Sequence, residues 1–281
     1  MFETDLLQGK RVLVTGGGTG LGRSMGARFA ELGADLVICG RRADVLEEAA
    51  GQLRRLRPGG VDVETQVCDL RDPEAVDAMM AQTWRRRPLD VLVNNAAANF
   101  IAQTHKMSYR AADSILNITL HGALYATMAA GSRWIEEGRR GTVLSILSTS
   151  VFTGRAFTTP SAMAKSGLLA MTRSLAVEWG PRGVRTVAIA PGPFPTPGAM
   201  ERLRPGPRAA GGNTASSNPL GRVGEHAELA NLAAFMISDA AGYINGEVVT
   251  IDGGQHLRAS GAEDLLGWTD AQWASLRATR S

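Results

Sequence analysis

Lysine is scarce in this chain, although arginine is not. The 281 residues contain 27 arginines but only three lysines, which are Lys10, Lys106 and Lys165. Arginine serves as well as lysine where only a surface charge is needed, whereas an ammonium group is a compact point charge with three donors. A lysine retained at position 165, just before a long helical stretch, therefore indicates a site that needs such a charge. The alternative is a lysine left by chance on a solvated face.

Cysteine is scarcer still, and long apolar runs are missing. Cys39 and Cys68 each end an apolar run, and no Cys-x-x-Cys or His/Cys spacing indicates a metal site. We expect both to be buried thiols in a reducing compartment. The first residues, Met1–Asp5, are acidic and lack the apolar core of a signal peptide. No apolar run approaches the ~20 residues of a membrane span. The sequence therefore predicts a cytoplasmic protein with no membrane partner.

Basic residues are numerous but scattered. The formal net charge is +3 and the isoelectric point is near 9.2. The one tight basic run, Arg85–Arg87, falls at the end of a predicted helix, where cations interact favourably with the helix dipole. A solvated helix end is favoured over a nucleic-acid site. No nucleic-acid partner is therefore predicted.

Apolar runs of strand length alternate with amphipathic helical stretches along the chain. Strands are expected at Arg11–Thr15, Asp35–Cys39, Val61–Cys68, Asp90–Asn94, Thr142–Leu147, Val184–Ala190 and Glu247–Ile251. Helices are expected between them, for example at Leu21–Leu32, Val45–Leu56 and Pro73–Arg86, the third with Asp72 as its N-cap. This order predicts an α/β fold, a single-domain, doubly wound parallel sheet with helices on both faces.

Two segments depart from the regular alternation. The segment Phe194–Arg222 is crowded with Pro, Gly and Ser and follows a late strand, so it is either a substrate lid or a disordered surface loop. The tail over residues 255–281 contains a capping-box pattern at Thr269–Gln272 that predicts a short helix. Trp268 and Trp273 are expected to pack this helix onto the body or onto a neighbouring subunit.

A strand, a glycine-rich turn and a helix start follow one another at the N-terminal end. The turn, Gly16–Gly22, has glycines that permit positive φ and a close approach of backbone to a pyrophosphate, whose charge would face the helix N-terminus. A glycine-rich turn can also serve folding alone. The correct context on both sides favours nucleotide binding.

The end of the second strand carries arginine where NAD-binding folds carry an acid. Arg41 and Arg42 suit the 2′-phosphate of NADP, although both arginines can also simply face water. Asp69 follows the third strand and Asn94–Ala97 the fourth, at the sheet edge where adenine and ribose would lie. Polar groups just past strand ends are often turn formers, but their shared position favours a role in binding. NADP(H) is the predicted cofactor.

Taken together, Thr15–Gly22, Asn94–Ala97, Ser148, Lys165 and Pro191-Gly192 resemble the short-chain dehydrogenase/reductase family, from about Lys10 to Gly254. That family places a Tyr four residues before the lysine, on the same helix face, where the ammonium lowers the pKa of the phenol. Here that position is Ser161. The tyrosines of the chain are Tyr109, Tyr125 and Tyr243, and none precedes a lysine by four residues. The family's Asn position holds Thr119.

A serine hydroxyl is a much weaker acid than a phenol, so Ser161 cannot simply replace the tyrosine. It can donate a hydrogen bond to a substrate carbonyl and stabilise an enolate, which favours reduction of a double bond conjugated to that carbonyl. One branch of the family does this, and the chain is similar to 2,4-dienoyl-CoA reductases. The matching stretches are Gly16–Gly22, Asn94–Phe100, Pro160–Lys165, Leu175–Gly180, Pro191–Pro193, Glu228–Phe235 and the tail through Trp273.

The resemblance implies residues for each part of the site. The catalytic candidates are Lys165, Ser161, Ser148, His121 and Thr119. The cofactor-binding candidates are Gly16, Thr19, Gly20, Leu21, Gly22, Arg41, Arg42, Asp69, Leu70, Asn95, Ala96, Lys165, Pro191, Gly192 and Phe194. The substrate-binding candidates are Asn99, Phe100, Ser150 and Ser161. No metal is implied.

The proton donor departs from both known patterns of this branch. Mitochondrial-type members carry a separate Tyr where this chain has Ser150, and an Asn where it has His121. Peroxisomal-type members use an acid where it has Thr119. His121 could deliver a proton near neutral pH, or it could be satisfied within a helix contact. Ser148 and Ser150 are weaker candidates, since hydroxyls after a strand usually cap turns.

The resemblance therefore implies an NADPH-dependent enoyl- or 2,4-dienoyl-CoA reductase of fatty acid β-oxidation, acting as a homotetramer on an acyl-CoA. Two alternatives remain open. One is an ordinary carbonyl/alcohol oxidoreductase of the wider family, which the missing tyrosine disfavours. The other is a catalytically silent NADP(H)-binding protein, which the retained Lys165 and the serine-rich site disfavour.

Overall fold

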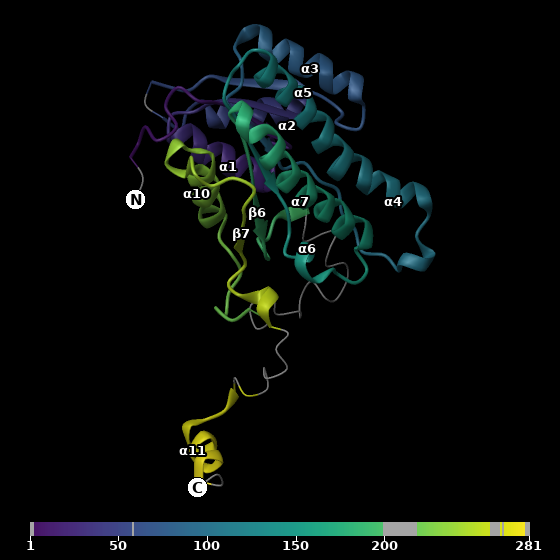
Figure 1. The fold of residues 1–281 in the computed structure, drawn as a ribbon, viewed down its shortest axis with the longest axis vertical. Helices are drawn as coiled ribbons and strands as arrows, with labels where there is room; N and C mark the ends of the chain where they lie inside the picture. The colour runs from purple at the N-terminus through teal and green to yellow at the C-terminus, as the bar shows by residue number, and fades with distance from the viewer. Residues whose placement is uncertain (1–2, 58, 199–217, 259–264, 266, 279–281) are drawn as a thin grey trace.

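A seven-stranded parallel sheet forms the centre of the molecule, as predicted (Figure 1). The computed structural model describes residues 3–57, 59–198, 218–258, 265 and 267–278. The spatial order of the strands is β3-β2-β1-β4-β5-β6-β7. The strands are β1 (Arg11–Thr15), β2 (Asp35–Gly40), β3 (Val63–Val67), β4 (Val91–Asn94), β5 (Gly141–Ile146), β6 (Val184–Pro191) and β7 (Val248–Ile251). Each strand begins and ends within two residues of its predicted bounds.

Helices cover both faces of the sheet, because the strand residues alternate between two apolar cores. Val12 and Val14 face one core and Leu13 the other, as expected for strands buried on both faces. The first face is covered by α1 (Gly20–Glu31), α2 (Ala43–Leu53) and α10 (His226–Ile237). The second face is covered by α3 (Pro73–Arg86), α5 (Gly122–Glu136) and α7 (Thr159–Trp179).

Shorter elements lie near the carboxyl ends of the strands and in the tail. They are η1 (Thr104–Lys106), α4 (Tyr109–Leu116), η2 (Asn117–His121), α6 (Ser150–Thr153), η3 (Gly180–Arg182), η4 (Asp239–Ala241), η5 (Gln255–Leu257) and α11 (Asp270–Ala278). The segment η2 is one turn of π-helix between α4 and α5. Such turns inside a helical run are frequent at functional sites.

Local signals read from the sequence are present where they were predicted. The Asp72 carboxylate accepts hydrogen bonds from the Glu74 and Ala75 amides and caps α3. The basic run that ends α3 pairs with acids, since Arg86 contacts Asp62 and Glu64 and Arg87 contacts Asp35. No helix in the described part of the chain is long and apolar enough to cross a membrane.

The two irregular segments are described only in part. The predicted lid spans 194–222, of which residues 199–217 lie outside the described residues. In the tail, the amide of Thr269 donates to Gln272 Oε1 and the predicted helix is present as α11. The rings of Trp268 and Trp273 pack on each other, with centroids 5.0 Å apart, and α11 stands apart from the sheet in Figure 1.

Candidate active site

Two cavities open side by side at the carboxyl edge of the sheet. The first measures about 770 Å³ and lies over the glycine turn and the ends of β2, β3 and β4. The second measures about 670 Å³ and lies over the ends of β5 and β6 and the start of α7. Four residues line both cavities and so mark the junction where two ligands would meet: Ala97, Ala98, Asn99 and Phe194.

The glycine turn forms a cradle that side chains would fill. Gly16 and Gly20 have positive φ, and a Cβ added at Gly22 would lie 2.4 Å from the Gly16 carbonyl oxygen. Helix α1 begins at Gly20 with no side-chain cap from Thr19 and no acid in its first turn. Its first amides are therefore left for an anion. The residues present fit the pyrophosphate of a dinucleotide.

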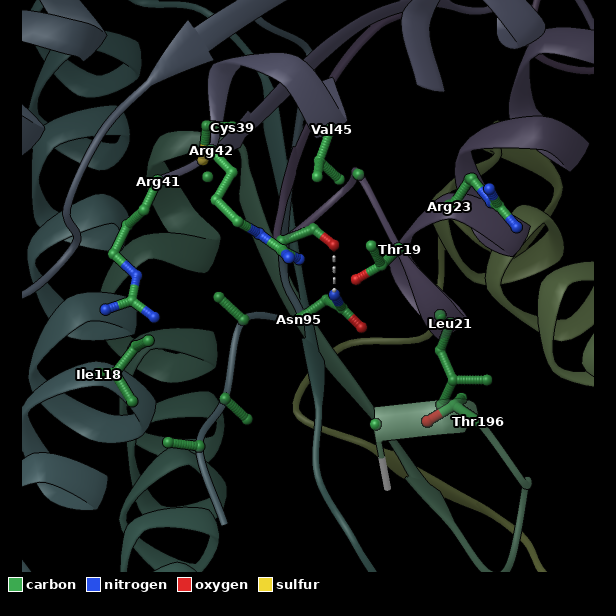
Figure 2. Close-up of a pocket in the computed structure, with 18 of the residues that line it drawn as sticks. Thr19, Leu21, Arg23, Cys39, Arg41, Arg42, Val45, Asn95, Ile118 and Thr196 are labelled. Carbon is green, nitrogen blue, oxygen red and sulfur yellow. Dashed lines mark hydrogen bonds between the residues drawn. The ribbon is translucent and has the colours of Figure 1, made fainter. Parts of the chain in front are cut away.

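Asn95 holds the cradle in shape from the end of β4. Its Nδ2 donates to the carbonyl oxygen of Thr15, at 2.9 Å, and to that of Gly16, at 3.4 Å. Figure 2 shows Asn95 beside the glycine turn, with one of its hydrogen bonds drawn as a dashed line. The Thr15 hydroxyl accepts from the amides of Asn95 and Ala96 and donates to the carbonyl of Val93. Asn95 therefore supports the turn through the backbone of β1, and both Asn95 and Ala96 line the cavity.

Positive charge gathers on one side of the first cavity. Arg41 and Arg42 follow β2, and their side chains point into the cavity in Figure 2. Asp69, after β3, also lines the cavity and is held by Arg71, whose guanidinium donates to both carboxylate oxygens. The hydrogen bond from Arg71 lowers the pKa of Asp69, so the carboxylate stays ionised. Nothing in the sequence pattern singled out Arg71.

Lys165 lies at the floor of the second cavity. It is 7% exposed, and its Nζ donates to the carbonyl oxygen of Ile146 at the end of β5. Burial lowers the pKa of Lys165 to about 8. Ser161 lies one turn earlier on the same face of α7 and lines the same cavity. The predicted pair is therefore present as a neighbouring ammonium and hydroxyl.

The serines after β5 line the second cavity as well. Ser148 Oγ accepts a hydrogen bond from the Ser150 amide at 3.3 Å, so this hydroxyl also serves the turn. Pro191 and Gly192, expected at the cofactor, line the second cavity and not the first, while Phe194 lines both. Phe100 lines neither cavity.

Thr119 and His121 lie in η2 and are absent from the described linings of both cavities. The Thr119 hydroxyl accepts from the Ala98 amide at 3.1 Å, so it acts on the junction through the backbone. His121 Nδ1 bonds to Asn117 Oδ1 at 2.9 Å within its own helical run. The ring of His121 therefore lies at a helix contact.

Several residues that line the cavities were missed from the sequence. In the second cavity these are Arg155, Gln255, His256 and Arg258, and in the first they are Arg23, Ser24, Thr196 and His226. Asp252, which bonds to His256, directly follows β7. Its place after a strand at the carboxyl edge of the sheet was a signal that could have found this pair.

Comparison with known proteins agrees with this geometry. The sequence model of a family described as Enoyl-(Acyl carrier protein) reductase matches residues 16–256. A probable 2,4-dienoyl-CoA reductase of Bacillus subtilis, named as (2E)-enoyl-CoA-producing, is 38% identical, with 89% of this chain and 98% of the relative covered. A probable 2,4-dienoyl-CoA reductase of Caenorhabditis elegans, named as (3E)-enoyl-CoA-producing, is also 38% identical, with 98% and 91% covered.

A solved structure shares the fold. A short chain dehydrogenase from Bacillus anthracis is 40% identical and superimposes with a TM-score of 0.81, with 90% of this chain and 99% of that chain covered. The family match spans most of the chain and includes the glycine cradle and Lys165. Members of this family bind a nicotinamide cofactor. The chain is an oxidoreductase that belongs to the short-chain dehydrogenase/reductase family.

Proposed function

We propose that this oxidoreductase reduces a conjugated carbon–carbon double bond in an acyl-CoA thioester, with NADPH as the reductant, in the manner of a 2,4-dienoyl-CoA reductase of fatty acid metabolism. The observation that carries the proposal is Ser161 beside the buried Lys165 in the second cavity. No tyrosine is among the described residues that line this cavity. The names of the Bacillus and Caenorhabditis relatives support the same reaction.

The first cavity would hold the cofactor. The glycine cradle and the first amides of α1 would bind the pyrophosphate, and Arg41 and Arg42 would pair with the 2′-phosphate that distinguishes NADP from NAD. Bound NADPH supplies a hydride with its electron pair. Asn99 lies at the junction of the cavities, and its buried Oδ1 has no hydrogen-bond partner among the described residues, so it is available to orient a ligand amide there.

The second cavity would hold the conjugated acyl group. The Ser161 hydroxyl would donate to the thioester carbonyl oxygen, and the Lys165 ammonium beside it would favour negative charge on that oxygen. Both groups stabilise an enolate more than the neutral substrate, because the charge on oxygen grows during the reaction. A phenol is not needed for this role, whereas a ketone reductase needs a group that protonates an alkoxide.

The domain organisation, location and assembly of the protein are part of the same proposal. We propose one domain over residues 1–281, a cytoplasmic location and a homotetramer. The buried thiols of Cys39 and Cys68 are free, and burial raises the pKa of these thiols to about 12 and about 11, so neither is poised to react. Free thiols of this kind suit a reducing compartment.

The test is the oxidation of NADPH by the pure protein with a 2,4-dienoyl-CoA, compared with NADH and with a simple ketone. We expect the absorbance of the diene and of NADPH to fall together, with little turnover of the ketone. Ser161→Tyr should lower dienoyl reduction and raise ketone reduction. Turnover of the ketone alone would indicate a carbonyl reductase, and tight NADPH binding without any turnover would indicate a silent binding protein.

The same preparation tests the preference for NADPH. Replacing Arg41 and Arg42 by alanine should weaken NADPH binding by roughly 10- to 100-fold, the effect of losing one or two charge-assisted hydrogen bonds, and should change NADH binding little. Arg182→Ala, an exposed arginine away from both cavities, is the matched control. Equal loss of NADH and NADPH affinity would contradict a role in 2′-phosphate recognition.

A further inference from the structure

A histidine–carboxylate pair lies at the second cavity, contributed by a part of the chain distant in sequence from Lys165. His256 is in η5, which begins four residues after the end of β7, and it lines the cavity together with Ser161 and Lys165. Its Nδ1 lies 2.7 Å from Asp252 Oδ2. The His256 ring is partly exposed, at 21%, whereas Asp252 is 4% exposed. The pair therefore has one buried member and one member that faces the cavity.

The Asp252 carboxylate is fixed in place. It accepts from the Gly254 amide at 2.9 Å and from the His256 amide at 2.8 Å, in addition to the His256 ring. The backbone carbonyl oxygen of Asp252 accepts a hydrogen bond from Asn218 Nδ2 at 2.7 Å. Burial would raise the pKa of Asp252, but these hydrogen bonds more than offset it, and the pKa lies below its ordinary value. The group is therefore an ionised acceptor.

A glycine after the neighbouring strand β6 leaves room for Asp252. A Cβ added at Gly192, the residue after β6, would lie 2.5 Å from Asp252 Cβ and 2.8 Å from Asp252 Cα. Only glycine lets the turn after β7 come this close to β6. The position of the pair at the cavity is thus built into the packing of two strand ends.

The Asp252 carboxylate engages one of the two nitrogens of the His256 ring. Because Nδ1 is engaged by Asp252, the other nitrogen, Nε2, is the one left for a ligand, and no described residue bonds to it. The ring of Phe152 lies beside the His256 ring, with the two ring centroids 5.6 Å apart. A carboxylate that binds one imidazole nitrogen sets the tautomer and stabilises the proton-carrying ring.

Charges from several elements face the same space. Asp252 is in contact with the His256 ring, and three cations also line the cavity. These cations are Lys165 of α7, Arg155 after α6 and Arg258 after η5.

The reduction requires a proton donor that the expected positions do not supply. Ser161 and Ser150 are weak acids, Thr119 bonds to a backbone amide, and His121 lies outside the described cavity linings. We propose that His256, oriented by Asp252, is the general acid that protonates the carbon next to the thioester. This inference rests on the proposed function.

The proposed reduction adds a hydride at C5 of the diene and a proton at C2. The hydride's electron pair forms the C5–H bond, and the π electrons of the C4=C5 double bond move along the conjugated chain and leave negative charge on the thioester oxygen, where Ser161 and Lys165 would lie. The enolate then returns these electrons to form a C–H bond at C2 while the Nε2–H bond of His256 breaks. The product is a 3-enoyl thioester, and the neutral histidine takes up a proton from water.

The test compares His256→Gln with His105→Gln, which removes an exposed histidine that lines neither described cavity. For His256→Gln we expect kcat to fall by about 100-fold or more, the usual contribution of a general acid, with the KM for the dienoyl-CoA and the Kd for NADPH changed less than about threefold. His105→Gln should behave as wild type. In heavy water the wild-type product should carry deuterium at C2.

Three further measurements separate proton transfer from a structural role. His256→Ala should regain activity when imidazole is added, and Asp252→Asn should lower kcat and change the pH profile while NADPH still binds. His256→Gln should change the shape of the pH profile, whereas the loss of rate that follows deprotonation of Lys165, whose pKa is about 8, should remain. Asp252 is a positioning residue in this scheme.

Results that would overturn the inference are distinct from failure of the proposed function. If the wild-type protein reduces no dienoyl-CoA, the proposed function fails. If the wild type is active but His256→Gln keeps its kcat, or imidazole does not rescue His256→Ala, His256 is not the donor. Loss of kcat in His121→Gln with full activity in His256→Gln would assign the proton to His121.

Discussion

At the scale of single residues, the cost of burying Lys165 is the feature with the clearest consequence. Burial lowers its pKa from 10.5 to about 8. Between these two pH values the unfolded chain binds a proton at this lysine that the folded protein does not. The free energy of unfolding therefore rises with pH across this window. Below about pH 8 the lysine is protonated in both states, and the cost of burying the ammonium is fully present.

This cost predicts how a variant without the charge behaves. Lys165→Met should be more stable than wild type at pH 7.5 by an amount that shrinks by about 3 kcal/mol as the pH rises to 10.5. Urea denaturation of the cofactor-free proteins at several pH values measures this difference, with Lys106→Met, an exposed lysine, as the control. A difference that stays constant with pH would contradict the lowered pKa. A site that accepts such a cost is consistent with a functional role for the lysine.

At the scale of elements, the approach of α5 to the loop after β3 shapes the cofactor cavity. Helix α5 begins at Gly122, where an added Cβ would lie 2.8 Å from Leu70 Cβ and 3.0 Å from the Leu70 carbonyl oxygen. Leu70 and Asp69 line the first cavity. A change in this contact would therefore move residues of the first cavity where the adenine is proposed to bind.

Gly122→Ala should lower the free energy of unfolding by roughly 1–3 kcal/mol, because the helix and the loop must move apart. We also expect weaker NADPH binding. Gly51→Ala in α2 is the matched control, since its Cβ would meet nothing within 4 Å, and alanine in an open helical position stabilises by up to about 1 kcal/mol. Thermal unfolding and NADPH titration of both variants give the comparison. Equal stability and equal NADPH affinity of the two variants would contradict a tight contact between α5 and Leu70.

At the scale of the whole molecule, exposed apolar side chains on two helices of one face support assembly. Met163 and Val177 lie about four turns apart on one face of α7 and are 57% and 79% exposed, and Met128 on α5 is 57% exposed. Such side chains on neighbouring helices are typical of contacts between subunits. They support the proposed homotetramer.

Light scattering should give a mass of about four times the 29.7 kDa of one chain. Val177→Asp should reduce this mass to that of a smaller species, because a charge would be buried without a partner. Leu56→Asp places the same charge at an exposed leucine after α2, on the other face of the sheet, and should leave the mass unchanged. A monomer in the wild type would overturn the tetramer.

Much of the architecture follows from the sequence because its causes are local. Buried parallel strands are continuous apolar runs, and the helices between them carry their own caps, as Asp72 does for α3. The glycine turn and Arg41-Arg42 could be placed at the same edge because parallel strands all end there. The single-domain organisation and the roles of these residues stay predictions.

The sequence by itself determined the order of the strands and helices, the cradle over α1 and the neighbouring hydroxyl and ammonium of Ser161 and Lys165. Only the tertiary structure decided which side chains face the two cavities. His121 turns to Asn117 within its own helical run, whereas His256 meets Asp252 at the cavity wall. The physical reason is that the direction of a side chain depends on packing between segments distant in sequence, such as the close approach of Gly192 to Asp252, which no local pattern encodes.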